Sequence, residues 1–286
     1  MLDYLRLMRI KNYIKNFLIF LPFIFSKKFL HLDKNYLVMC LGFICFCCCS
    51  SIAYILNDIF DLENDKLDSK KKDRPLVSGK IRIKNAIHLI ILLFLLFIIG
   101  CFYLRNLEVF IIGCFYLVLN ILYSKILKNI PIIDITVLSS FFLIRIYYGG
   151  YLVNAPVSVY LYLTILSVAF MMGINKRKIE LIQNKCCRPV LEKYNIAFLD
   201  NLSFMFCGLS IVFYSLWVIN HATVVINSNI LYISIFLVVF ILIYYQYVMS
   251  NNNVDSNPVD VLLNNKVLLI ASIIYCIFIL LGFVYA

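Results

Sequence analysis

The stretch "LNDIFDLENDKLDSKKKDRPLVSGK", residues 56–80, decides the fold of this chain. It follows an uncharged run at residues 36–56 and precedes a second apolar run at residues 85–104. A helix needs about 20 apolar residues to cross the hydrocarbon core of a bilayer. The two runs therefore predict two membrane-spanning helices, with the charged stretch between them at one membrane surface.

The composition of the whole chain points the same way. Hydrophobic residues make up 63% of the 286 residues and charged residues 14%, which is too apolar for a soluble domain. Lys27 and Lys28 interrupt the first apolar window of spanning length, which is residues 13–32. We expect an all-α membrane protein, a bundle of about nine transmembrane helices, from windows near residues 13–32, 36–57, 84–104, 107–126, 130–150, 157–174, 198–219, 227–248 and 266–285.

The distribution of basic residues predicts the orientation. With the N-terminus inside, all but five of the 26 Lys and Arg residues lie on the cytoplasmic side, as the positive-inside rule requires. A basic surface beside anionic lipid accounts for the net charge of +11 without a nucleic-acid partner. No cleavable signal peptide is expected, because charges continue to Lys15. We predict an integral protein of the inner or plasma membrane whose N-terminus and charged loops are cytoplasmic.

Acidic residues are concentrated in the opening stretch, which holds six of the fifteen carboxylates between Asp58 and Asp73. If the preceding helix continues through residue 65, Asp58, Asp61 and Asp65 share one face, with Asn57 beside them. Three carboxylates on one face repel one another, so a cation is expected among them. Oxygen ligands in this pattern suit Mg²⁺. The alternative is a solvated polar loop that its own lysines stabilise.

Basic residues follow directly. Lys71 and Arg74 precede Pro75 and the turn sequence "LVSGK" at residues 76–80, which would bring the bases back over the acidic face. Carboxylates that hold Mg²⁺, together with bases that neutralise phosphate charge, are what a metal–diphosphate site needs.

"NDIFDLEND", residues 57–65, matches the N-D-x-x-D-x-x-x-D pattern of the UbiA-type intramembrane prenyltransferase superfamily, and "KKDRPLVSG", residues 71–79, resembles the segment that follows it there. The resemblance implies one UbiA-like domain over residues 1–286. It also implies nine transmembrane helices around a cavity open to the cytoplasmic side and to lipid. Four residues would hold the Mg²⁺ ion: Asn57, Asp58, Asp61 and Asp65.

A second motif separates the branches of this superfamily. Where members that alkylate aromatic acceptors carry D-x-x-x-D in the loop after the sixth helix, this chain has "MMGINKRKIELIQNK" at residues 171–185. Lys176, Arg177 and Lys178 stand there, and Glu180 is the only acidic residue. Cations in place of carboxylates should bind an anion directly, which indicates a second phosphate-bearing partner. The pattern resembles the decaprenyl-phosphate phosphoribosyltransferase branch.

Three other stretches resemble the same branch. They are "RIKNYIKN" (residues 9–16, with Lys15, Asn16, and Tyr13 in place of the usual Trp), "LKNIPIIDITVLSSFFLIRIYYGG" (127–150, with Lys128, Asp134 and Arg145), and "NPVDVLLNNKVL" (257–268). Asp134 and Arg145 are eleven residues apart, so they share a helix face. Ionisable residues within a span usually line a cavity. Arg145 either contacts a ligand or pairs with a neighbour to fix the helices.

The resemblance implies Mg²⁺-dependent transfer of a 5-phosphoribosyl group from phosphoribosyl diphosphate to a polyprenyl phosphate, a step in making a lipid-linked sugar donor for the cell envelope. Asp58, Asp61, Lys176 and Arg177 would be catalytic. The substrate-binding residues would be Lys15, Asn16, Lys71, Arg74, Lys128, Asp134, Arg145 and Glu180.

Two other functions are open. One is prenyl transfer from a prenyl diphosphate to an aromatic or glycerophosphate acceptor. The other is a transporter or lipid-binding protein, which is disfavoured because no paired broken helices are evident and the acidic cluster lies at a membrane boundary.

Overall fold

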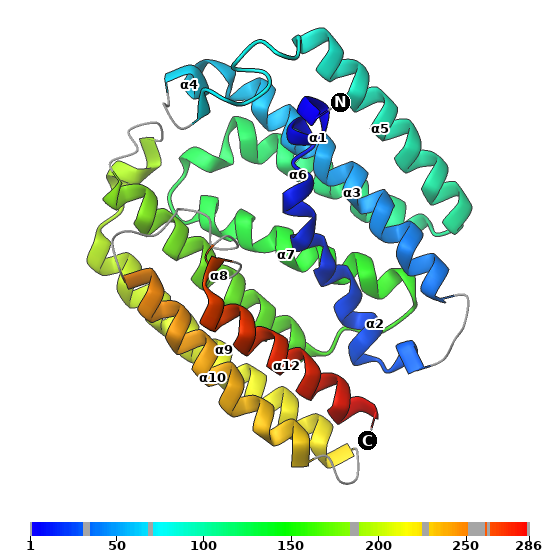
Figure 1. Ribbon diagram of the computed structural model, residues 1–286, viewed down its shortest axis with the longest axis vertical. Helices are drawn as coiled ribbons and strands as arrows, with labels where there is room; N and C mark the ends of the chain where they lie inside the picture. The colour runs from blue at the N-terminus through cyan, green and yellow to red at the C-terminus, as the bar shows by residue number, and fades with distance from the viewer. Residues whose placement is uncertain are drawn as a thin grey trace. The chain divides into compact units, whose positions relative to one another are not determined.

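The computed structural model describes residues 2–30, 35–67, 71–183, 189–224, 229–250, 261 and 264–284. These residues are mainly helical and contain no strand (Figure 1). The predicted all-α membrane fold is confirmed. Eight described helices are long and apolar enough to cross a membrane. They are α3 (Asn35–Phe60), α5 (Ile83–Leu104), α6 (Leu107–Lys125), α7 (Ile133–Leu152), α8 (Val159–Ile182), α9 (Ile196–Val224), α10 (Asn229–Ser250) and α12 (Lys266–Val284).

The first predicted span has a different structure. Residues 13–32 do not form one long α-helix, because the 3₁₀-helix η1 (Ile10–Phe20) leads into the short helices α2 (Leu21–Phe25) and η2 (Lys28–Leu30). Pro22 stands at the start of α2, where its missing N–H costs no hydrogen bond. A 3₁₀-helix rises about 2.0 Å per residue, so η1 and α2 together extend about 30 Å, the thickness of the hydrocarbon core. The count of nine spans therefore stays a prediction.

The chain forms two compact units. Unit 1 comprises residues 1–137 and 141–157, and unit 2 comprises residues 138–140 and 158–286. The cavity open to the cytoplasmic side, the orientation in the membrane and the single domain over residues 1–286 remain predictions.

In unit 1, α3 is the central helix. It packs against α5, α6 and η1. The N-terminal segment also approaches α7 closely, since a Cβ atom added to Gly149 would lie 1.9 Å from the carbonyl oxygen of Ile19. Only glycine allows two backbones to come this near. The position of η1 is therefore fixed by contacts with both α3 and α7.

In unit 2, α8 packs against α9, and α10 packs against α9 and α12 (Figure 1). Its core is apolar, with Met171, Ile179, Leu242 and Leu268 among the buried residues. A hydrogen-bonded polar cluster also lies in this unit: Ser203 and Gln246 hydrogen-bond to opposite ends of the Asn175 amide at 2.9 and 3.0 Å. These bonds tie α8, α9 and α10 together.

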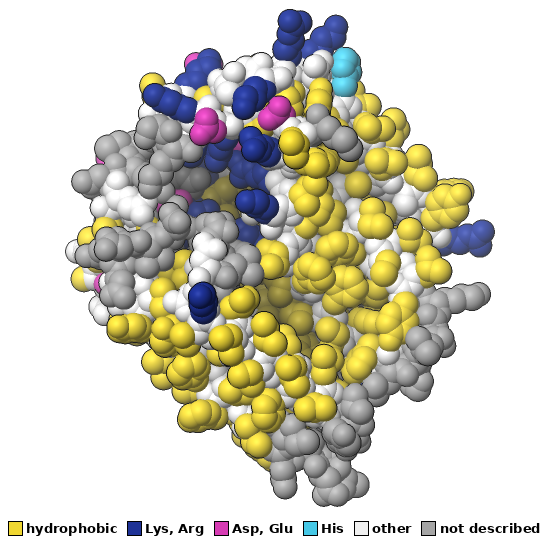
Figure 2. Space-filling view, viewed as in Figure 1, with side chains coloured by type: hydrophobic (Ala, Val, Ile, Leu, Met, Phe, Trp, Pro, Cys, Tyr) yellow, Lys and Arg dark blue, Asp and Glu magenta, His cyan; other side chains and the backbone are white. Residues whose placement is uncertain are grey.

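The surface matches a lipid environment. Figure 2 shows hydrophobic side chains over most of the described face, whereas Lys, Arg, Asp and Glu gather near the end of unit 1 that carries α4 (Leu62–Leu67) and the start of α5. The most apolar window of α5 is only 17% buried. Such an exposed apolar helix is stable when lipid covers it.

Candidate active site

The acidic motif lies where α3 ends at Phe60 and α4 begins at Leu62. The backbone N–H of Asp61 donates to the carbonyl of Asn57 at 2.9 Å, and that of Asp65 donates to the carbonyl of Asp61 at 2.8 Å. The helical hydrogen-bond pattern thus runs across the break at Asp61. The local structure is close to the continuous helix on which the one-face arrangement was predicted.

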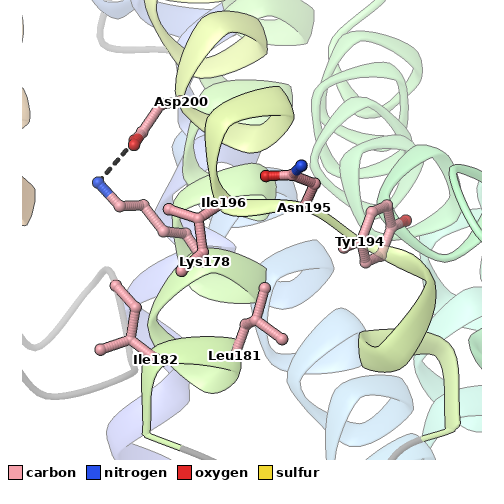
Figure 3. A pocket seen from close by; sticks show the side chains of 7 residues that line it. All are labelled: Lys178, Leu181, Ile182, Tyr194, Asn195, Ile196 and Asp200. Atoms are coloured by element: carbon pink, nitrogen blue, oxygen red, sulfur yellow. Dashed lines mark ion pairs between the residues drawn. The ribbon is translucent and has the colours of Figure 1, made fainter.

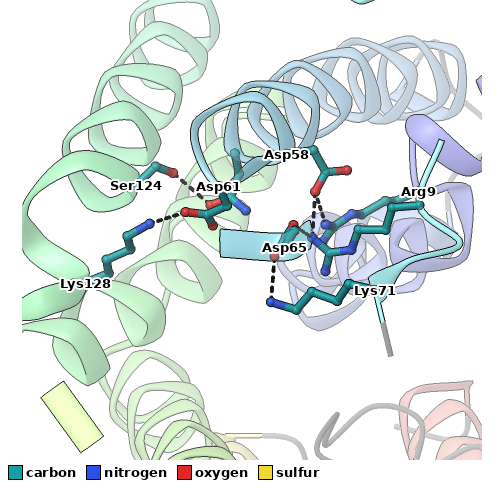
Figure 4. A network of polar contacts seen from close by, with 9 residues as sticks. Arg9, Asp58, Asp61, Asp65, Lys71, Ser124 and Lys128 are labelled. Carbon is teal, nitrogen blue, oxygen red and sulfur yellow. Dashed lines mark hydrogen bonds and ion pairs between the residues drawn. The ribbon is translucent and has the colours of Figure 1, made fainter. Parts of the chain in front are cut away.

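Asp58 and Asp65 are buried and share one cation. The Arg74 Nη1 atom contacts Asp65 Oδ2 and lies 3.0 Å from Asp58 Oδ1, while Lys71 Nζ lies 2.7 Å from Asp65 Oδ1 (Figure 4). The two carboxylates are 4% and 1% exposed. These bases contact the acidic residues, as the sequence predicted, and directly after them a turn is closed by a 3.1 Å bond from Ile81 N to the Pro75 carbonyl.

The other two predicted metal ligands contact the end of α6 and the short segment that follows it. Lys128, on the short helix η4 (Leu127–Asn129), contacts Asp61 through Nζ and Oδ1, and Ser124 Oγ donates to Asn57 Oδ1 at 3.0 Å. Figure 4 shows Ser124, Lys128 and Asp61 to the left of the end of α3, and Asp58, Asp65 and their basic partners to its right. The structure therefore brings Lys128, which is remote in sequence, to the first motif.

Arg9 also belongs to this cluster, although the sequence did not single it out. Its Nη2 atom contacts Asp58 Oδ1, the same oxygen that Arg74 approaches (Figure 4). The guanidinium carbon lies 5.4 Å from the ring centroid of Tyr54. Arg9 opens the stretch "RIKNYIKN", so a cation at the start of that stretch was the available signal.

The carboxylates of the first motif have the chemistry to bind a divalent cation, but they do not yet converge on one point. The position of Arg74 between Asp58 and Asp65 shows that these carboxylates can share one positive charge, and oxygen donors suit Mg²⁺. Within the described part of the chain, however, no group of three acidic, His or Cys side chains converges closely enough to hold a metal ion. The carboxylates would therefore have to come closer together before three of them could bind one ion.

Asn16 and Arg145 form a separate buried cluster. Arg145 is 3% exposed and donates from Nε to Asn16 Oδ1 at 2.9 Å, from Nη1 to the Phe141 carbonyl at 2.5 Å and from Nη2 to Tyr116 Oη at 3.2 Å. Its guanidinium carbon lies 5.3 Å from the ring centroids of Phe46 and Tyr116. None of the hydrogen bonds of Arg145 to described residues goes to a carboxylate. These contacts join α7 to η1 and α6, and both predicted roles of Arg145 stay predictions.

Asp134 and Lys15 complete the predicted residues of unit 1. Asp134 is fully buried in the first turn of α7, on the helix that also carries Arg145. Lys15 is partly buried on η1.

The second motif, in unit 2, is helical and not a loop. Lys176, Arg177 and Glu180 lie in the last two turns of α8, which ends at Ile182, although the apolar window predicted an end near residue 174. The cause is that Lys, Arg, Glu and Ile continue a helix well, and no glycine or proline intervenes before Pro189. Arg177 is fully buried and donates from Nη1 to Glu180 Oε2 at 2.5 Å.

A groove of about 770 Å³ opens beside this motif within unit 2 (Figure 3). Lys178 Nζ pairs with Asp200 Oδ1 of α9 at 2.6 Å and joins the two helices at the groove. The groove is lined by Lys178, Leu181, Ile182, Tyr194, Asn195, Ile196 and Asp200. Half of the stretch 257–268, quoted for its resemblance, lies outside the described residues.

Comparison with known proteins shows the family to which the chain is similar. The model of the UbiA prenyltransferase family matches residues 20–264. The decaprenyl-phosphate phosphoribosyltransferase of Mycolicibacterium smegmatis is 28% identical over 181 residues, which are 62% of this chain and 56% of the relative. The digeranylgeranylglyceryl phosphate synthase of Sulfurisphaera tokodaii is 51% identical over 47 residues, 16% of each protein. Three curated relatives, the M. smegmatis enzyme among them, are covered over only 34% to 66% of their own length.

A solved structure shares the fold. It is that of a UbiA homolog from Archaeoglobus fulgidus bound to GPP and Mg²⁺, with a TM-score of 0.71 and 18% identity over 99% of this chain and 98% of that one. The family match covers most of the chain, and the motif at residues 57–65 lies within it. The chain is an integral membrane protein and belongs to the UbiA prenyltransferase family.

Proposed function

We propose that this UbiA-family transferase moves a 5-phosphoribosyl group from phosphoribosyl diphosphate to a polyprenyl phosphate in a Mg²⁺-dependent reaction. The observation that carries the proposal is the basic character of the second motif. Lys176 and Arg177 stand where a second acidic metal motif serves aromatic prenylation, so this site suits a phosphate group. The match to the M. smegmatis phosphoribosyltransferase supports the same assignment.

The donor diphosphate is assigned to unit 1. Asn57, Asp58, Asp61 and Asp65 would hold Mg²⁺, which when bound supplies positive charge to the departing diphosphate. Lys71 and Arg74 already contact Asp58 or Asp65 and would bind diphosphate oxygens as the metal takes their place. Lys128, paired with Asp61, is a third base for this role.

The reaction forms one bond and breaks one bond at C1 of the ribose. An oxygen of the polyprenyl phosphate attacks C1, and the bond from C1 to the diphosphate oxygen breaks with its electron pair leaving on diphosphate. No strong general base is needed, because the acceptor is already an anion. Lys176 and Arg177 would bind a phosphate of one of the substrates, and Glu180, which contacts Arg177, would orient it.

The remaining assigned residues have supporting roles. Lys15 and Asp134 are proposed to contact substrate. For Asn16 and Arg145, the buried hydrogen bond between them supports a positioning role. The apolar surfaces of the spanning helices suit an isoprenoid chain.

Prenyl transfer is the second candidate. The short match to a digeranylgeranylglyceryl phosphate synthase and the fold shared with a homolog bound to GPP and Mg²⁺ favour it. In that reaction the same metal site would hold a prenyl diphosphate, and the acceptor would be aromatic or a glycerophosphate. The two functions therefore share the first motif and differ in the group that is transferred.

The test is incubation of purified protein with labelled phosphoribosyl diphosphate, polyprenyl phosphate and Mg²⁺, followed by lipid extraction. We expect the label in the lipid fraction, and no label there when the polyprenyl phosphate is omitted. A parallel reaction contains prenyl diphosphate with an aromatic acid or a glycerophosphate. Product only in the parallel reaction would reject phosphoribosyl transfer.

A further inference from the structure

The N-terminal segment is attached to the first half of the site through several polar contacts with α3. Ser51 Oγ donates to the Met8 carbonyl at 3.1 Å and lies 2.7 Å from Tyr13 Oη. Asn16 Nδ2 donates to Ser50 Oγ at 3.1 Å. Met8 directly precedes Arg9, and Tyr13 and Asn16 follow it. Contacts on both sides of Arg9 therefore hold its backbone beside α3 and limit which groups its side chain can reach.

Arg9 itself adopts an uncommon backbone conformation. Its φ of 53° and ψ of 49° place it in the left-handed region, which is costly for a residue with a side chain. At this position the chain passes from α1 (Leu2–Leu7) into η1. The conformation carries the guanidinium to Asp58 Oδ1, where Arg74 Nη1 already lies 3.0 Å away (Figure 4). Strained backbone of this kind often marks a functional position.

The formal charges show what Arg9 adds. Asp58, Asp61 and Asp65 carry three negative charges, and the side chains that contact them carry four positive charges: Arg9, Lys71, Arg74 and Lys128. This set has a net charge of +1. One Mg²⁺ ion alone would raise it to about +3, whereas Mg²⁺ with a diphosphate of charge about −3 would return it to about zero.

We propose that Arg9 couples the binding of metal to the binding of diphosphate. Without ligand, its guanidinium occupies an oxygen of Asp58 that the metal needs, so the metal alone binds weakly. When diphosphate binds together with the metal, Arg9 leaves the carboxylate and contacts a diphosphate oxygen. Each ligand then binds more tightly than it would alone. Arg9 is thus a diphosphate-binding residue that couples the two ligands. This inference rests on the metal–diphosphate site of the proposed function, and it holds for a phosphoribosyl or a prenyl donor.

Binding measurements with Mn²⁺ and inorganic diphosphate test this coupling without turnover. Titration calorimetry and the electron paramagnetic resonance signal of free Mn²⁺ give the two affinities on the purified full chain. For the wild type, diphosphate should tighten Mn²⁺ binding about 10-fold or more. Arg9→Gln should bind Mn²⁺ alone about 5- to 10-fold more tightly than the wild type. It should bind diphosphate in the presence of Mn²⁺ about 10-fold more weakly.

The opposite signs of these two changes distinguish coupling from docking. If Arg9 only holds the N-terminal segment in place, Arg9→Gln lowers both affinities together. That result, or no change in either affinity, overturns the proposal. Equal Mn²⁺ affinity of the wild type with and without diphosphate also overturns it.

Two further variants complete the experiment. Arg6→Gln is the matched control, because Arg6 is exposed on α1 and contacts none of the three carboxylates; it should bind both ligands as the wild type does. Arg9→Lys keeps the charge, so Mn²⁺ alone should bind as weakly as to the wild type. If Arg9→Gln does not fold, tighter Mn²⁺ binding by Arg9→Lys would overturn the proposal. A failure of the product assay with these binding results intact would reject the phosphoribosyl donor and leave the coupling in place.

Discussion

Replacing Asn16 by alanine is expected to destabilise the protein far more than its small change in volume implies. Asn16 is fully buried and accepts a hydrogen bond from Arg145 Nε at 2.9 Å. It also donates to Ser50 Oγ at 3.1 Å. Alanine removes the acceptor of a buried guanidinium that has no carboxylate partner among the described residues.

The expected loss follows from these contacts. Hydrogen bonds between neutral groups in membrane proteins are worth about 0.6 kcal/mol on average, and Ser50 Oγ still donates to the Phe46 carbonyl at 2.9 Å. The bond to Arg145 is worth more, about 1.5–3 kcal/mol, because one partner is charged. We therefore expect Asn16→Ala to lower the free energy of unfolding by about 2–3.5 kcal/mol.

The assay is equilibrium unfolding in mixed micelles by SDS titration, followed by far-UV circular dichroism. Asn12→Ala is the matched control on the same segment, because the Asn12 side chain is only partly buried and makes no hydrogen bond to a described residue. In the double variant Asn16→Ala/Arg145→Met the orphaned charge is absent. The loss of unfolding free energy in the double variant should be smaller than the sum of the losses in the two single variants by about 1 kcal/mol or more.

Two outcomes would refute this reasoning. In the first, Asn16→Ala and Asn12→Ala destabilise the protein equally, within about 0.5 kcal/mol. In the second, the losses of the two single variants add up in the double variant. Either result would mean that the contact with Asn16 does not stabilise the Arg145 guanidinium.

Three other predictions concern catalysis. Asp58→Asn and Asp61→Asn should each lower turnover about 100-fold or more with unchanged circular dichroism. The control Glu63→Gln, which changes an exposed ion pair with Lys66, should keep near-normal turnover. Near-normal activity of either Asp variant would contradict the metal assignment. EDTA should stop the reaction and Mg²⁺ or Mn²⁺ should restore it, because all proposed ligands are oxygens; turnover after thorough chelation would argue for a purely cationic site. Arg177→Ala should weaken substrate affinity, turnover or both, and Arg177→Lys should recover little, because one point charge cannot replace a planar fork; unchanged kinetics would leave Arg177 with a structural role.

The long helices could be predicted closely from hydropathy. The windows 84–104 and 107–126 became Ile83–Leu104 and Leu107–Lys125. Hydropathy reports the length that lipid covers, and it fails where a helix leaves the apolar region or changes type. For this reason α8 extends eight residues beyond its predicted end at residue 174, and the first span contains the 3₁₀-helix η1.

The site shows a similar limit. The turn after Pro75 was visible in the sequence, so the approach of Lys71 and Arg74 to the carboxylates could be predicted. The contact between Arg9 and Asp58 could not, because 49 residues separate them and the contact depends on how η1 packs against α3. The bond between Asn16 and Arg145 joins residues 129 positions apart for the same reason.

The identity of the transferred group is tested most directly by a competition in one reaction. Purified protein receives phosphoribosyl diphosphate and a prenyl diphosphate at equal concentration, with Mg²⁺, polyprenyl phosphate, an aromatic acid and a glycerophosphate. Intact-mass analysis of the lipid extract then shows which acceptor has gained which group. We predict that polyprenyl phosphate gains one phosphoribosyl unit while the prenyl diphosphate is unchanged. A prenylated acceptor that forms equally well without phosphoribosyl diphosphate would contradict the account.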